Sequence, residues 1–288
     1  MVATILLIGF GALRFIIGAY DRQLLSDAAQ LLNLSVASIE NELRRVEQIS
    51  QTILADPNLQ RQLRAVKQTE AAYEGFQARA QIDDMLLTHA LSEPYINSIH
   101  IVDSRGNQIS AGVHARPLTA ELWRWILAQA LPAQGRVVWI PPSGGDDSLI
   151  AARIVRQIED LTLEYLGLLI LRINMKELIE LFAESYPSAA MNLHIFAPDG
   201  TVYTSDPWLL ELGSELVDDD VYGIEEIEGR RYIVSYTRPR YSGWTYMYLL
   251  PYESVYQQTL SVTSTVTLLY LGVLVAALSA SMRFIRSI

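Results

Sequence analysis

The stretch S-I-H-I-V-D-S-R-G-N-Q-I (residues 98–109) has a second version later in the chain, N-L-H-I-F-A-P-D-G-T-V-Y (residues 192–203). Each version is a short apolar run followed by a turn that contains glycine, which is the pattern of a β-hairpin. His100 and Gly106 align with His194 and Gly200 without a gap. The match is short, so the surroundings of each stretch decide whether the chain contains two related units.

The later parts of the two units are also alike. A glycine, a strand pattern and a helix start follow one another from Gly167 and again from Gly243. The sequence therefore predicts an α+β fold in which two tandem antiparallel-sheet modules, each with one face covered by helix, follow a long N-terminal helix. The expected strands lie at 96–102, 136–140, 149–158 and 163–173, then at 191–196, 201–204, 231–237 and 244–250, with helices at 119–130 and 175–185.

An apolar stripe marks the predicted long helix. Apolar residues recur every seven positions from Leu25 to Ile53, and others follow four positions after the first three of them. We expect this stripe to pack on its own domain in its outer part. Seven-residue spacing also suits a parallel helix pair, so near the start of the helix we expect contact with a second copy of the chain. Asp56 and Pro57 should end the stripe and cap another helix.

Both ends of the chain are apolar and basic. The run from Thr259 to Met282 has 24 residues and no charge, so it is long enough to cross a bilayer as a helix. Arg283 and Arg286 follow it directly. Basic flanks favour the cytoplasmic side, so we expect a cytoplasmic C-terminus. The first 20 residues are apolar but contain Arg14, and we favour an uncleaved membrane helix over a cleaved signal peptide. Because no basic leader precedes it, we expect the natural start to lie upstream.

These patterns predict a cell-membrane protein of two spans, with residues 21–258 outside the cell. Between the spans lie all 32 acidic residues but only 19 of the 22 basic ones, and the net charge of −10 argues against a nucleic-acid partner. The expected divisions are a transmembrane helix at 1–20, a helical region at 21–92, a membrane-distal module at 93–186, a membrane-proximal module at 187–257, a transmembrane helix at 258–282 and the start of a cytoplasmic linker at 283–288.

The chain resembles the double Cache sensor region of YesM-type membrane sensor histidine kinases of Gram-positive bacteria. The resemblance is one of layout and extends over almost the whole chain. It rests on residues 34–43, Asp56-Pro57 to Leu63, L-I-A-A-R-I at 149–154, L-G-L-L-I at 166–170, and Gly243-Trp244 running to Pro251.

The resemblance implies that the distal module binds a small molecule and that the proximal module relays a shift to the second span. It also implies a homodimer, a histidine kinase beyond Ile288 and a cognate response regulator, and it makes a carbohydrate-related ligand plausible. Chemoreceptors and diguanylate cyclases carry similar sensors, so both outputs stay open. A further alternative is a protein-interaction module that recognises a binding protein.

The predicted ligand site lines the sheet of the distal module and its covering loops. Aromatic rings offer apolar faces to a ligand, and charged side chains supply oriented hydrogen bonds. Several of these residues also have a purely structural explanation. The tryptophans could pack in the core, and the histidine could make its hydrogen bonds within its strand. The arginine of A-A-R-I-V could face solvent or pair with an acidic residue. The predicted ligand-binding residues are Trp123, Trp139, Arg153, His100, Asp103 and Arg116.

Signals for catalysis and for metal binding are missing from the sequence. There is no cysteine, no G-x-S-x-G and no H-E-x-x-H, and the four histidines do not have metal-ligand spacing. We therefore expect no catalytic residue, no metal and no cofactor in this chain. A membrane-tethered hydrolase is the least favoured reading.

Overall fold

The computed structural model describes residues 2–68, 72–141, 148–158, 162–185, 192–198, 221–227 and 229–253, with single positions at 272, 275 and 279. The predicted strand at 201–204 and the predicted linker at 283–288 lie outside these residues, as does nearly all of the predicted span at 258–282. Within the described part, no helix combines the length and the hydropathy that crossing a bilayer requires.

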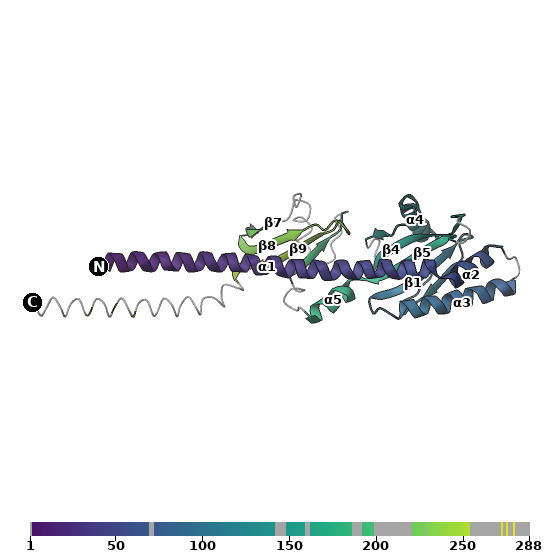
Figure 1. Cartoon of the computed structure of the whole chain (residues 1–288), viewed down its shortest axis with the longest axis horizontal. Coiled ribbons are helices and arrows are strands. Elements are labelled where there is room, and N and C mark those ends of the chain that lie inside the picture. Colours follow the sequence, from purple (N-terminus) through teal and green to yellow (C-terminus); the bar gives the residue numbers. More distant parts are fainter. Residues whose placement is uncertain are drawn as a thin grey trace, which may run out of the picture.

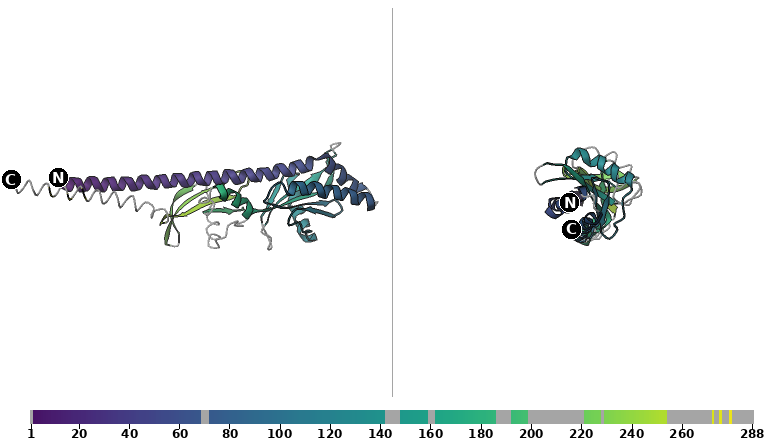
Figure 2. Two further views of the ribbon diagram at one scale, coloured as in Figure 1. Left: turned by 90° about the horizontal axis from the view of Figure 1, so that it is seen from below. Right: turned by 90° about the vertical axis from the view of Figure 1, so that its right-hand side faces the viewer.

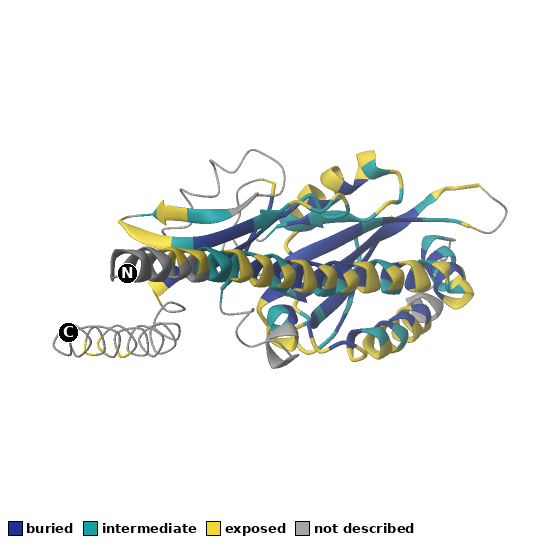
Figure 3. Cartoon of the chain, turned by 60° about the vertical axis from the view of Figure 1, so that its left-hand side comes forward, coloured by how far each residue is buried: buried dark blue, intermediate teal, exposed yellow. Residues whose placement is uncertain are grey.

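A single long helix, α1 (Val2–Ala55), runs along the whole molecule (Figure 1). Its apolar stripe is buried from Ala28 to Ile53 against the sheets of the same chain, while the opposite side of the helix faces solvent (Figure 3). The predicted packing on its own domain is thus confirmed. Contact with a second copy of the chain stays a prediction.

Two shorter helices follow α1 at the far end of the molecule. Asp56 separates them from α1, and its Oδ1 accepts hydrogen bonds from the backbone N–H groups of Asn58 and Leu59 at 2.7 and 3.1 Å. Asp56 therefore caps the next helix, as predicted, and proline occupies its first position. These helices are α2 (Pro57–Gln68) and α3 (Ala72–Ala90).

The first sheet has five antiparallel strands in the order β2-β1-β5-β4-β3. Helix α4 and a short 3₁₀ turn connect β2 to β3, and α5 leaves from the end of β5. We call β1 to β5 with α4 the first module. The bounds are β1 (Ile96–Asp103), β2 (Gln108–Ala111), α4 (Ala120–Ala130), the 3₁₀ turn (Leu131–Ala133), β3 (Val138–Ile140), β4 (Ser148–Arg156), β5 (Tyr165–Asn174) and α5 (Met175–Ser185).

Helices lie on both faces of the first sheet. Helices α1, α2 and α3 lie on one face, where Ile99, Leu169 and Leu171 join the large apolar core. Helix α4 lies on the other face, and its Ile126 packs with Ile170 in a second core (Figure 2). Because successive strand residues point to opposite faces, each strand contributes alternate side chains to the two cores.

The second sheet has four described strands in the order β6-β9-β8-β7. This order repeats the β1-β5-β4-β3 part of the first sheet, so the predicted duplication is visible in the pairing. Strand β7 is not among the predicted strands. We call these strands the second module, and their bounds are β6 (Leu193–Phe196), β7 (Val221–Ile227), β8 (Arg230–Thr237) and β9 (Thr245–Pro251).

The glycine at the start of β5 has a steric reason. A Cβ atom on Gly167 would lie 2.5 Å from the carbonyl oxygen of Val102 in β1, which is closer than such atoms approach. Glycine thus allows β1 and β5 to pair closely at Asp103. The matching strands of the second sheet, β6 and β9, are also antiparallel, but a Cβ atom on Gly243 would meet no atom within 4 Å, so the steric reason applies to the first sheet alone.

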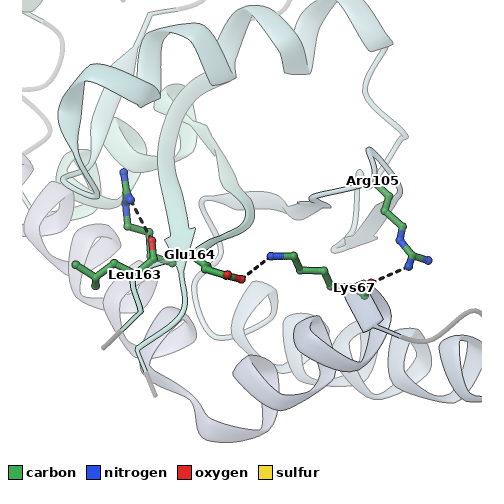
Figure 4. A network of polar contacts seen from close by, with 5 residues as sticks. Lys67, Arg105, Leu163 and Glu164 are labelled. Atoms are coloured by element: carbon green, nitrogen blue, oxygen red, sulfur yellow. Dashed lines mark hydrogen bonds and ion pairs between the residues drawn. The ribbon is translucent and has the colours of Figure 1, made fainter. Parts of the chain in front are cut away.

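A group of polar contacts joins three segments at the end of the first module farthest from the start of α1 (Figure 4). The Lys67 ammonium lies 2.7 Å from Glu164 Oε2, which lowers the pKa of that exposed carboxyl below its usual value. Arg105 donates to the Lys67 carbonyl at 2.7 Å, and Arg156 donates to the Leu163 carbonyl at 3.1 Å. The contacts connect the end of α2 with the β1–β2 and β4–β5 turns.

Candidate functional site

A group of polar side chains lies on the α4-facing side of the first sheet, toward one end of the strands. His100 and Ser98 are fully buried there. The His100 ring bonds to both neighbouring hydroxyls, with Nε2 2.8 Å from Ser98 Oγ and Nδ1 2.7 Å from Ser110 Oγ. Because each hydroxyl can donate or accept, both serines can bond to the ring, and together they hold the imidazole in one orientation.

An arginine extends this group across the next two strands. Arg172 in β5 is directly opposite Ser98 in β1 and Ile150 in β4, so its side chain is on the same face as His100. Arg172 Nη2 is 3.5 Å from Ser148 Oγ, and Asn97 Nδ2 is also 3.5 Å from that oxygen. We name the whole group the polar cluster; its members are Asn97, Ser98, His100, Ser110, Ser148 and Arg172.

The polar cluster occupies one part of this face of the sheet, and α4 covers the other part. The part under α4 is apolar and includes Ile150, Ile154 and Ile170. The segment after β2 returns to the polar end, where the His114 N–H donates to the Asn97 carbonyl at 3.2 Å. The arrangement gives hydroxyl, amide, imidazole and guanidinium groups beside an apolar surface, which is the composition typical of a site for a small polar molecule.

The predicted site residues are not brought together in one place. Of the six, only His100 belongs to the polar cluster. Trp123 of α4 packs on the α4 side, with its ring near Gly106, while Arg116 is exposed in the segment before α4. Asp103 accepts from the backbone N–H groups of residues 105 and 107 at 2.9 and 2.8 Å, so its carboxylate shapes the hairpin turn.

The other two predicted residues lie on the face that packs on α1. Trp139 is half-buried against the large core. Arg153 donates from Nε to the Gly135 carbonyl and from Nη1 to Ser50 Oγ of α1 at 3.3 Å. Burial lowers the pKa of its guanidinium below the usual value, and the nearby charge of Glu47 acts in the opposite direction. A ligand role for these six residues stays a prediction.

Sequence reasoning did not select the remaining members of the polar cluster. The signal for Arg172 was present, because it is a lone charge in the apolar run L-L-I-L-R-I, as Arg153 is in A-A-R-I-V. Ser98, Ser110 and Ser148 carried no signal of their own. Within the described residues, no three His, Cys, Asp or Glu side chains gather closely enough to hold a metal ion.

The chain is similar in sequence to a known protein. It is 27% identical over 259 residues to the sensor histidine kinase YesM of Bacillus subtilis, which covers 89% of this chain and 45% of that kinase. The resemblance drawn from the sequence is thereby confirmed. The chain spans less than half of the length of this relative, and no family model matches it.

Solved structures share the fold at low sequence identity. The ligand-binding domain of the Campylobacter jejuni chemoreceptor Tlp3, in complex with L-norvaline, has a TM-score of 0.59 at 11% identity and covers 81% of this chain and 92% of its own. The extracellular domain of a protein classed as a histidine kinase has a TM-score of 0.58 at 13% identity, covering 80% and 94%. The fold is therefore that of Cache-like sensory domains.

Proposed function

We propose that this chain is the extracytoplasmic sensing and transmembrane signalling region of a bacterial two-component sensor histidine kinase, and that a small polar molecule binds at the polar cluster of the first module. The observation that carries the proposal is the row of polar side chains from Ser110 to Ser148, built around buried His100 and facing the same side as α4. The similarity to YesM and the sensory-domain fold support it.

The signalling route follows the order of the modules along α1. In our proposal, residues 93–186 form the membrane-distal sensor and residues 187–257 the membrane-proximal relay. Helices at 1–20 and 258–282 would cross the membrane in a homodimer, and a kinase beyond Ile288 would phosphorylate a response regulator. A ligand must bind the two signalling states with different affinity, because equal binding would shift nothing.

Two ligand classes fit the polar cluster. Serine, asparagine and histidine side chains can hydrogen-bond a carbohydrate-related ligand, the class that the resemblance favours. The Arg172 guanidinium also suits a carboxylate. That feature favours an amino acid as the second candidate, and related folds have been solved with L-norvaline and L-arginine bound.

A thermal-shift screen of the whole chain in detergent tests the site. Sugars, amino acids, organic acids and peptides are added singly, and the right ligand should raise the unfolding temperature because it binds only the folded state. The gain corresponds to about 2.7 kcal/mol at a ligand concentration one hundred times Kd. Arg172→Gln should remove the shift. Arg153→Gln, a matched change on the opposite face, should retain it.

Two results would oppose this assignment. If no compound in the panel shifts the transition, small-molecule sensing by this chain loses its support and an interaction module that recognises a binding protein becomes the better proposal. If Arg153→Gln removes the shift and Arg172→Gln keeps it, the ligand binds on the α1 side of the sheet.

The coding DNA on either side of this segment tests the output. An in-frame continuation into a helical linker and a histidine-kinase region is expected. A methyl-accepting or diguanylate cyclase region would retain the sensor and change the output class. A stop codon directly after Ile288 would contradict the kinase proposal.

A further inference from the structure

A cavity of about 510 Å³ lies between the two modules, away from the polar cluster. It adjoins β3, the edge strand of the first sheet, whereas the polar cluster centres on β1, β2 and β5. We name it the junction cavity. Its lining residues are Ala133, Arg136, Val137, Val138, Trp139 and Pro141 of the first module and Pro198, Ser242 and Trp244 of the second.

The walls of the junction cavity are largely apolar. Trp139 is half-buried and presents part of its ring to the cavity, whereas Trp244 is 2% exposed and supports the wall from the core, with its ring 6.4 Å from that of Tyr246. Pro141 and Pro198 add further ring surfaces. Indole and proline rings lose little conformational entropy on binding, so these walls suit a flat or cyclic ligand. The volume also falls in the range of roughly 300–1,000 Å³ typical of small-molecule sites.

An arginine at the cavity wall supplies the polar anchor. Arg136 is exposed, and its guanidinium makes no hydrogen bond or ion pair with any residue in the described part of the chain. Its neighbour in space, Arg153, is by contrast bonded to the Gly135 carbonyl and to Ser50. Arg136 therefore has its full set of donors available to a carboxylate, which arginine binds in a bidentate manner.

We propose that the junction cavity binds a small cyclic anion, such as an aromatic carboxylate, with its ring against Trp139 and its carboxylate on Arg136. This site is separate from the polar cluster and does not depend on the function proposed above. Its lining comes from both modules, so an occupant contacts both at once.

The cavity lies beside contacts that already connect the modules through α1. Tyr241, adjacent to Ser242, donates to Glu47 Oε2 of α1 at 2.7 Å, and the Arg44 guanidinium lies 4.8 Å from the Tyr241 ring. Burial and the hydrogen bond to Glu47 raise the pKa of the Tyr241 hydroxyl, so this proton stays in place at ordinary pH. A bound anion would add a direct bridge between the modules to this indirect one.

Calorimetric titration of the whole chain with 2-naphthoate tests the proposal. We expect saturable binding with one site per chain and a rise in the unfolding temperature. Arg136→Gln should weaken the affinity by about tenfold or more, because it removes a charge-assisted hydrogen-bonded pair. Trp139→Ala should weaken it comparably. Arg124→Gln, which removes another exposed arginine beside a tryptophan, should leave the affinity unchanged.

Several outcomes would overturn the inference. They are the absence of saturable binding at millimolar 2-naphthoate, equal affinity for the neutral analogue 2-naphthalenemethanol, and unchanged affinity in both Arg136→Gln and Trp139→Ala. Loss of binding in Arg172→Gln with retention in Arg136→Gln would place the anion in the polar cluster. That result would contradict the junction site while supporting the proposed function. Arg136 is exposed, so its replacement is not expected to prevent folding.

Discussion

Buried Glu40 shows how individual residues hold α1 against the second sheet. The residue is 3% exposed, and its Oε1 accepts a hydrogen bond from the Tyr246 hydroxyl at 3.0 Å. Its Oε2 is buried and has no hydrogen-bond partner among the described residues. A buried carboxylate is costly unless hydrogen bonds compensate it, so the one bond from Tyr246 carries unusual weight.

Tyr246→Phe should therefore destabilise the chain by about 2–3 kcal/mol, because the carboxylate stays buried and loses its donor. Urea unfolding followed by circular dichroism measures the change. Tyr252→Phe is the matched control, since its acceptor Asp21 is half-buried and can exchange the bond for water at a cost of about 1 kcal/mol or less. Equal losses in the two variants would contradict the special role of Glu40.

The two strand arginines show why the site was only partly predictable from the sequence. Arg153 and Arg172 have the same local signal, one charge in an apolar run, and only Arg153 was selected. Which face each one occupies depends on strand register, since a shift by one residue exchanges the faces. The observed register pairs Arg153 with Leu169 and Arg172 with Ile150, which places the arginines on opposite faces. Single-strand patterns do not contain that information.

At the scale of elements, strong local signals gave correct predictions. Helix α5 was predicted with its observed bounds, and the hairpin turn at Gly106 follows from a glycine with φ of +85°. Strand β7 was missed because V-Y-G-I-E-E-I contains a glycine and two glutamates, which are unfavourable in isolated strands. Its strand character comes from pairing with β8, a contact absent from local sequence.

The connection between β4 and β5 contains a strained residue. Leu163 has φ of +53° and is 55% exposed, so a bulky side chain occupies the left-handed region without burying its surface. This conformation costs roughly 1–2 kcal/mol for an ordinary residue, and asparagine tolerates it better. Leu163→Asn should thus stabilise the chain by about 0.5–1 kcal/mol, measured as a rise in the urea midpoint.

Ile158 provides the control for that change. It is an exposed apolar residue of the same connection, 49% exposed, without a positive φ. Ile158→Asn should alter stability by less than about 0.5 kcal/mol. A comparable gain from Ile158→Asn would attribute the effect to reduced surface hydrophobicity instead of relief of backbone strain.

At the scale of the whole molecule, the proposed topology predicts which parts reach the outside of the cell. Leu91, after α3, is 62% exposed. These 288 residues contain no cysteine, so a single introduced thiol is the only one in them that can react. In intact cells, a membrane-impermeant maleimide should label Leu91→Cys. It should label Ser287→Cys only after permeabilisation.

The unaltered chain gives the background in this labelling experiment. Labelling of Ser287→Cys in intact cells would reverse the proposed orientation of the C-terminus. Failure to label Leu91→Cys, with labelling after permeabilisation, would place the first module inside the cell.

The contacts that hold α1 impose an order on folding. Tyr246 and Glu40 are 206 positions apart, and Tyr252 and Asp21 are 231 apart, so these bonds close only when nearly the whole described chain has been synthesised. Helix α1 leaves the ribosome before β8 and β9, so the part of its apolar stripe that packs on these strands stays uncovered until they are synthesised. Such long-range closure is slow and exposes apolar surface meanwhile. The nascent chain therefore has its greatest tendency to aggregate just before β9 is synthesised.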